Sequence, residues 1–154
     1  TVLNARIYRV GDYRPEPRGN LLNIEETRRV FFGMKEQHKE ILVNSNCDTK
    51  YLVFPDREND ICSFDTGCLI WLYTRAGYTE VTPEDISFAT PISKDHLLIL
   101  DLNTGNFNYG TEEENAAMRA EAEADLFEFI KSIRIEFSPE IQAQIDEARA
   151  TESA

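Results

Sequence analysis

The chain has 154 residues, the size of a single domain, and 42% of them are apolar while 29% are charged. This composition is typical of a folded globular protein, and no apolar run approaches the roughly 18 residues of a membrane-spanning helix. The formal net charge of -12 argues against binding to nucleic acid or to anionic lipid, because both ligands are bound through Lys and Arg. We expect a cytoplasmic protein without a cofactor.

The chain opens with a predicted strand followed by a proline-containing loop. Loosely alternating apolar residues favour a strand over residues 5–10. Two prolines then hold residues 14–19 in an extended loop, since they remove backbone donors and restrict the preceding residues.

The first predicted helix covers residues 23–38. Asn23 followed by Glu26 fits a helix N-cap and its reciprocal partner. A strand over residues 28–32 is the alternative. The residues that share one helical face are Ile24, Thr27, Phe31 and Met34 or Lys35.

The middle of the chain predicts an antiparallel meander of about five or six strands. Short apolar runs, separated by turn residues, are the candidates for these strands, at residues 41–43, 51–54, 61–64, 69–73, 78–81, 96–102 and 107–109. A short helical turn is expected at Thr82–Asp85, where a threonine cap precedes proline. Both faces of residues 69–73 are apolar, which indicates a central strand with Trp71 in the core.

Two of the expected turns contain Thr-Gly. One is Asp65-Thr66-Gly67 and the other is Asn103-Thr104-Gly105. Glycine tolerates the positive φ of such turns, which explains both segments. Asp-Thr-Gly is also the signature of aspartic proteases, whose chemistry needs a second carboxylate. Asn103 stands where that carboxylate would be, so a hairpin turn is the preferred interpretation.

The three cysteines, Cys47, Cys62 and Cys68, lack the spacing of a zinc site, and we expect no bound metal. Buried, reduced thiols are the expectation, and a disulfide between Cys62 and Cys68 is the alternative. His38 and His96 stand far apart in the sequence, and the residues around them do not indicate a cysteine–histidine pair.

The clearest helix covers residues 111–133, where Thr111 and Glu114 match a capping box. Its expected core-facing stripe is Met118, Ala122, Leu126, Phe129, Ile130 and Ile133. A second helix begins at residue 138 with a thinner apolar stripe. We therefore predict an α+β fold: a single domain over residues 1–137, with an N-terminal helix and C-terminal helices packed on the sheet, and a loosely docked helical tail over residues 138–154.

Negative charge is concentrated toward the C-terminus, with net charges of +2, −6 and −8 over residues 1–44, 45–111 and 112–154. Complementary charge accelerates association with a basic partner, so we expect a non-enzymatic domain that binds a basic protein. A solvated acidic face is the alternative. The expected partner-binding residues are Glu112, Glu113, Glu114, Glu121 and Asp125, a second acidic edge of Asp56, Glu58 and Asp60, and the aromatic residues Tyr73 and Tyr78.

Two other functions remain open. A hydrolase or small-molecule-binding protein would have a pocket on the sheet, marked by Asp65 beside a second carboxylate or by a cysteine beside His96. A structural or viral accessory subunit would have a large symmetric interface.

Residues 50–133 resemble the SUKH superfamily, the SMI1/KNR4-like proteins, many of which are bacterial immunity proteins. The similarity lies in Tyr51-Leu52-Val53-Phe54, in the strand–turn–strand unit over residues 98–107, and in Asp125-Leu126-Phe127-Glu128-Phe129-Ile130, which is similar to the family's terminal helix. The first 45 residues lack the family's early Trp. The resemblance implies an α+β fold and a role in binding and neutralising another protein, and it transfers no catalytic residue. Taken with the acidic charge, it predicts an immunity protein that neutralises a basic toxin domain.

Overall fold

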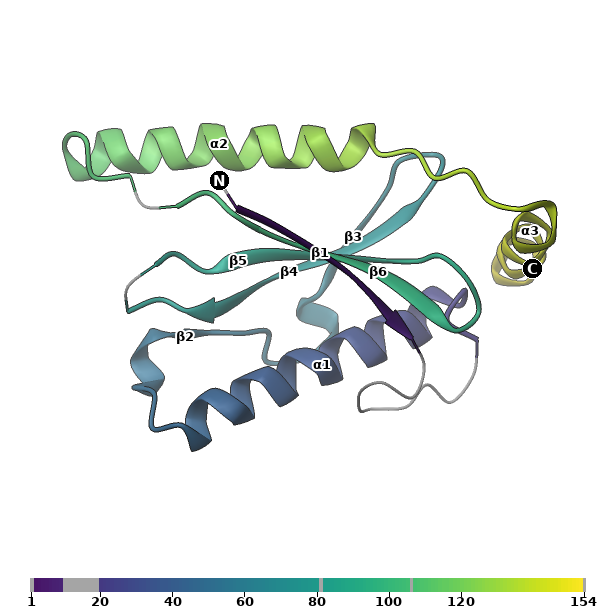
Figure 1. The fold of residues 1–154 in the computed structure, drawn as a ribbon, viewed down its shortest axis with the longest axis horizontal. Helices are drawn as coiled ribbons and strands as arrows, with labels where there is room; N and C mark the ends of the chain where they lie inside the picture. Colours follow the sequence, from purple (N-terminus) through teal and green to yellow (C-terminus); the bar gives the residue numbers. More distant parts are fainter. Residues whose placement is uncertain (1, 10–19, 81, 106, 154) are drawn as a thin grey trace.

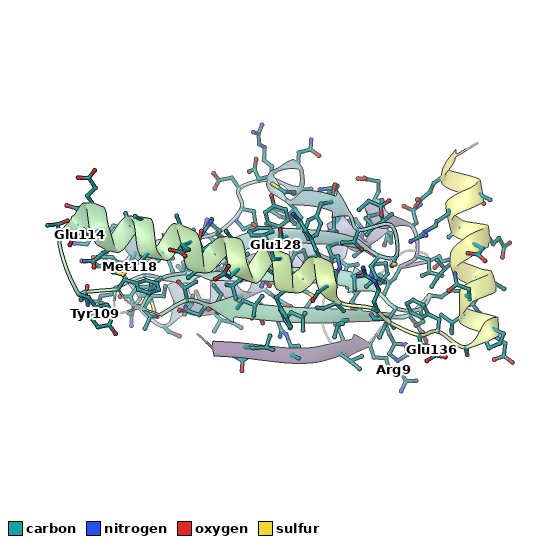
Figure 2. All side chains as sticks on the ribbon, turned by 90° about the horizontal axis from the view of Figure 1, so that it is seen from above. Arg9, Tyr109, Glu114, Met118, Glu128 and Glu136 are labelled. Carbon is teal, nitrogen blue, oxygen red and sulfur yellow. The ribbon has the colours of Figure 1, made fainter. Side chains whose placement is uncertain are left out.

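A computed structural model describes residues 2–9, 20–80, 82–105 and 107–153. The fold is α+β, as the sequence predicts: an antiparallel sheet of six strands separates two helices (Figure 1). Helix α1 (Ile24–Asn44) covers one face and α2 (Glu112–Ser132) the other. Helix α3 (Pro139–Ser153) runs transverse to α2 beyond its last turn (Figures 1 and 2).

The strands are β1 (Val2–Arg9), β2 (Leu52–Val53), β3 (Cys62–Asp65), β4 (Ile70–Tyr78), β5 (Asp85–Pro91) and β6 (His96–Asn103). Their order is β1-β6-β5-β4, with β2 and β3 pairing with opposite ends of β4. Strands β3 to β6 form an antiparallel meander, in which β3, β4 and β6 match predicted strands, and β1 completes the sheet by pairing with the last strand. Short 3-10 turns, η1 (Thr49–Tyr51) and η2 (Glu58–Asp60), flank β2.

Strand alternation divides the core into two layers. On the α1 side, Leu72 and Ile99 pack against Val30 and Phe31 of the helix. On the α2 side, Trp71 is fully buried, as predicted, and Leu126 and Ile130 of α2 lie over it with other side chains of the cluster. The remaining members of the α2 layer are Leu69, Ile86, Phe88, Leu100 and Leu102.

Helix α1 is longer than predicted. The Asn23 side chain caps it by accepting a hydrogen bond from the backbone N–H of Glu25 at 3.0 Å. Residues 41–43, expected to form a strand, belong to this helix. The chain leaves the helix at Asn46, which has a φ of 62° that asparagine tolerates better than most residues.

The expected helical turn at residues 82–85 was wrong, and β5 was missed. Asp85 is instead the first residue of β5, which lies between β4 and β6. A strand in that position is buried on both faces, and small or polar residues such as Ser87 and Ala89 occupy its α1 side. Such a strand has neither a long apolar run nor strict alternation in its sequence.

Three further expectations need correction. Tyr78 ends β4 instead of starting a new strand. Residues 107–109 form no strand, and the backbone N–H groups of Tyr109 and Gly110 donate to the side chain of Asn115 in α2. The cysteines are free thiols, and both Cys62 and Cys68 are exposed instead of buried.

The predicted loop over residues 14–19, Val10, Val81 and Asn106 lie outside the described residues.

The two Thr-Gly segments are turns of one kind. The Asp65 carboxylate accepts a hydrogen bond from the N–H of Gly67 at 2.7 Å, and the Asn103 side-chain oxygen accepts one from Gly105 at 2.6 Å. Both glycines have positive φ, 87° and 78°. An aspartate or asparagine that bonds to the backbone two residues later is the usual way to hold such a turn.

Helix α2 begins with the predicted capping box between Thr111 and Glu114. Of its expected core stripe, Leu126 and Ile130 are buried, whereas Phe129 is 44% exposed. Among the described residues, none of the helices combines the length and the apolar character that crossing a membrane requires.

Candidate functional site

A hollow of about 380 Å³ lies between the second half of α1 and the sheet. Its charged or titratable lining residues are Arg6, Lys35, His38, Asp85 and Asp101, and its apolar lining residues are Met34, Ile41 and Ala76. They come from five elements, α1, β1, β4, β5 and β6. A hollow lined by apolar walls and a few polar groups is the usual form of a small-molecule site.

The hollow exists because the α1-facing side of the sheet changes from apolar to polar along the strands. One cross-strand row, Ile99–Ala89–Leu72, is apolar and packs under α1. The neighbouring row on the same face is displaced by two residues on each strand and consists of Asp101, Ser87 and Thr74. These polar side chains offer no apolar surface to a helix, and the hollow lies beside them.

Lys35 and Asp101 meet at this polar row. Lys35 of α1 is only 5% exposed, and its Nζ lies 3.7 Å from Oδ1 of Asp101. The Lys35 ammonium also lies 5.3 Å from the centre of the Phe31 ring, and the Ser87 hydroxyl donates to the Asp101 carboxylate. Burial lowers the pKa of Lys35, although the negative charge of Asp101 acts in the opposite direction. This amine therefore loses its proton more readily than a lysine at the surface.

Three more titratable groups surround the pair. Nη2 of Arg6 lies 3.7 Å from the other Asp101 oxygen. The Asp85 carboxylate accepts a hydrogen bond from the Asn103 side chain at 3.0 Å. His38 packs edge-on against Phe54, with 5.2 Å between ring centres, and the partial burial of its ring and the nearby lysine lower its pKa. Its imidazole therefore loses its proton at a lower pH than that of a fully solvated histidine.

The arrangement can accept and donate hydrogen bonds and can move a proton over a short distance. It combines an amine, two carboxylates, a guanidinium and an imidazole around one hollow. Among the residues that the structure describes, no group of three His, Cys, Asp or Glu side chains is placed to hold a metal ion.

The acidic residues predicted on α2 are all exposed, but they do not share one direction. Glu114, Glu121 and Asp125 follow one side of the helix, because residues four and seven apart return to the same side. Glu128 extends this acidic line toward the other end of α2 (Figure 2). Glu112 and Glu113 project elsewhere, since each residue turns an α-helix by about 100°.

The second predicted acidic edge lies away from that line. Asp56, Glu58 and Asp60 are exposed around η2, which packs against α1 on the other side of the sheet from α2. The Asp60 carboxylate accepts backbone hydrogen bonds from Asp56 at 3.2 Å and Arg57 at 3.0 Å, so it holds its own loop.

The two predicted aromatic anchors lie apart on β4, with Tyr73 in its first half and Tyr78 as its last residue. Tyr73 packs among Phe64, Phe88 and Phe127 beneath α2. Tyr78 contacts Tyr51 at 6.0 Å between ring centres. The Tyr78 hydroxyl donates to Glu80, and this hydrogen bond raises the pKa of Tyr78 to about 12.

The residues named as markers of a hydrolase have other contacts. Asp65 is exposed and its carboxylate caps its own turn. His96 contacts Asp95 at 2.8 Å and Ser93 at 2.9 Å through Nδ1.

The sequence carried two signals for the hollow. Lys35 falls on the apolar face of its helix, where a charge is costly to bury. Asp101 stands in an otherwise apolar strand, on the same side as Leu97 and Ile99. Their meeting depends on β5 and on the path of α1, which the sequence pattern did not predict. Comparisons with protein-family models, with curated proteins and with solved structures found no match to this chain.

Proposed function

We propose that this protein is a binding domain for a small polar molecule, which it holds in the hollow between α1 and the sheet. The observation that carries the proposal is the convergence of Lys35, Asp101 and Arg6 on one hollow of about 380 Å³. That volume lies within the range of ligand sites, roughly 300–1,000 Å³.

The energetic argument concerns Lys35. Burying an ammonium group costs several kcal/mol unless close partners replace the water that it loses, and Asp101 at 3.7 Å is a loose partner. Methionine or leucine would fill the same place on α1 without that cost. Perturbed charged groups that line a cavity are typical of functional sites.

The test is a titration of the 15N-labelled protein with small amines, carboxylates and amino acids, followed by amide chemical shifts. We expect at least one class to shift the amides of Lys35, His38, Asp85 and Asp101 together and saturably. The variant Ile41→Trp should block the hollow at its mouth, because Ile41 is 62% exposed there. Ile41→Ala is the matched control and should bind as the wild type does. If no compound shifts these amides, the proposal fails.

A second function, binding of a basic protein, is favoured by the acidic line on α2 that comprises Glu114, Glu121, Asp125 and Glu128. Phe129 is exposed on the same helix and offers an apolar contact beside the charges. Neutralisation of a toxin domain remains an expectation from the resemblance to the SUKH superfamily.

A Lys-rich synthetic helical peptide tests this second function. Its affinity should fall steeply with salt, because screening weakens surface attraction. Replacing Glu121 and Asp125 with lysine should abolish binding, while lysine at Asp56 and Glu58, which changes the net charge by the same amount, should have a smaller effect. Equal losses in the two variants would show attraction to net charge alone and would contradict a defined surface on α2.

A further inference from the structure

We propose that the ε-amine of Lys35 forms a reversible imine with a small oxo acid, a molecule that carries both a carbonyl and a carboxylate group. The inference rests on the proposed function, because it names the ligand class of the same hollow. It goes further by assigning a covalent step to one residue.

The amine is placed for this chemistry. Lys35 is 5% exposed, lines the hollow and lies beside the apolar side chains of Phe31 and Met34. Attack on a carbonyl requires the neutral amine, and the burial that lowers the pKa of Lys35 increases that fraction at neutral pH. By contrast, the side chains of Lys50 and Lys131 are 66% and 54% exposed.

Asp101 is placed to move the protons. Its Oδ1 lies 3.7 Å from Nζ of Lys35 and also accepts the hydrogen bond from Ser87. In the first half of the reaction the Nζ lone pair forms a bond to the carbonyl carbon and the C=O π bond breaks. The proton lost from nitrogen passes through the Asp101 carboxylate to the new hydroxyl group.

In the second half the remaining proton on nitrogen passes through the Asp101 carboxylate to that hydroxyl, which leaves as water while nitrogen and carbon form the double bond. The amine and the carbonyl compound become an imine and one water molecule. No atom is oxidised or reduced.

Arg6 is the residue that we expect to bind the carboxylate of the ligand. Its side chain is 45% exposed and lines the hollow, and its contact with Asp101 uses one end of the guanidinium. A guanidinium carries five N–H donors in a planar fork, which matches a carboxylate. Asp85 lines the hollow as a second negative charge, so the ligand carboxylate is expected on the side of Arg6.

The experiment uses the full chain with pyruvate as the probe and sodium cyanoborohydride to reduce any imine to a stable amine. Intact mass should rise by the mass of pyruvic acid less one oxygen atom, and peptide mapping should place the adduct on Lys35. Acetone, which lacks a carboxylate, should label Lys35 at least about tenfold more slowly. Arg6→Gln should slow labelling by pyruvate more than labelling by acetone.

Control variants separate the site from general lysine reactivity. Lys35→Met and Lys35→Arg should both lose the adduct, and Lys131→Met should keep it. If either Lys35 variant fails to fold, the peptide map of the wild type decides the question. Adducts spread over exposed lysines would overturn the inference.

The two proposals fail in different ways. If pyruvate shifts the amides around the hollow but leaves no adduct on Lys35, the hollow binds its ligand and the imine step is wrong. If no small molecule of any class shifts those amides, the proposed function itself is wrong.

Discussion

The guanidinium of Arg75 on β4 donates two hydrogen bonds to the carboxylate of Glu123 on α2, from Nη1 to Oε1 at 2.8 Å and from Nη2 to Oε2 at 2.7 Å. Arg119 and Glu84 complete a closed group of alternating charge, with Arg119 lying 3.1 Å from Glu84 and 3.5 Å from Glu123. The buried apolar residues of α2, Leu126 and Ile130, all lie in its second half. The ion pairs therefore hold the middle of the helix to the sheet.

Glu123→Gln should lower the free energy of unfolding by about 1 kcal/mol, the upper end for exposed pairs, because its side chain is 18% exposed and bound at two points. Urea denaturation followed by circular dichroism measures the change. Glu121→Gln, at an exposed position outside the group, is the matched control and should change stability little. A double-mutant cycle with Arg75→Met should show coupling, and additive effects would mean that the pair contributes nothing.

The ion pair between Arg75 and Glu123 should also make the stability of the protein depend on pH. The hydrogen bonds from Arg75 hold the pKa of Glu123 below its usual value of 4.5. A carboxyl group with a lowered pKa in the folded state stabilises the fold above the unfolded-state pKa, and this contribution is lost as the pH falls through the folded-state pKa. The stability difference between the wild type and Glu123→Gln should therefore be constant near neutral pH and shrink in acid. A difference that grows in acid would contradict this assignment.

Lys35 should lose its proton at lower pH than the other lysines. Its pKa lies below the usual 10.5 because of burial. Between the folded and unfolded pKa values the unfolded chain binds more protons, so stability should rise with pH in that range. A 13C-detected titration of the lysine side chains, with Lys35→Met to assign the signal, measures the pKa directly. A Lys35 signal that titrates with the surface lysines would show that water reaches the amine freely.

The sequence pattern predicted those parts of the fold that depend on neighbouring residues. The capping box at Thr111, the cap at Asn23 and the turn at Asp65 all came from contacts within a few residues. β5 was missed because its character comes from its two neighbours in the sheet. Ser87 and Ala89 are buried there only because β4 and β6 lie on either side.

The hollow could be predicted even less well. Lys35 and Asp101 each stood on the correct face of its element, but 66 residues separate them in the sequence. Their contact requires the register of β5 with β6 and the position of α1 over it. Neither the register nor the helix position produces a pattern among neighbouring residues of the sequence. The acidic line on α2, by contrast, follows from helical spacing alone.

Substitutions at Gly67 test how much the positive φ of this residue matters for the stability of the turn between β3 and β4. Its φ is 87°, and nothing lies within 4 Å of where a Cβ would be. Gly67→Ala should therefore cost about 1–2 kcal/mol through backbone strain alone, without a steric clash. Gly67→Asn should cost less, because asparagine tolerates this conformation. Equal losses in thermal unfolding would mean that the strain does not come from φ.

Substitutions at Trp71 test how much the packing beneath α2 contributes to stability. It is fully buried, and its indole N–H has no hydrogen-bond partner among the described residues. Trp71→Ala should cost about 3–5 kcal/mol. Trp71→Phe should cost clearly less, since it keeps most of the ring volume and removes a buried donor whose isolation is itself unfavourable. A phenylalanine variant as unstable as the alanine variant, judged by urea midpoints, would show that the N–H is bound after all.

We predict that helix α3 is released more easily than α1 or α2, because among the described residues it buries one apolar side chain. Ile145 is its buried apolar residue, Arg149 donates to the carbonyl of Cys68 at 3.0 Å, and Glu152 accepts from the N–H of Ile24 at 3.1 Å. The last contact places a carboxylate at the positive end of α1, where it is favourable but exposed to screening.

Hydrogen exchange measured by mass spectrometry should therefore show less protection in residues 139–153 than in α1 or β4. Ile145→Asp should remove the remaining protection of α3, because a charge cannot replace the buried isoleucine. Ile141→Asp is the matched control, since Ile141 lies on the same helix and is only partly buried. The exchange of α1 beyond its first turn should not change in either variant. If Ile145→Asp also exposes the centre of the sheet, α3 is an integral part of the core and the prediction of a loosely docked tail is wrong.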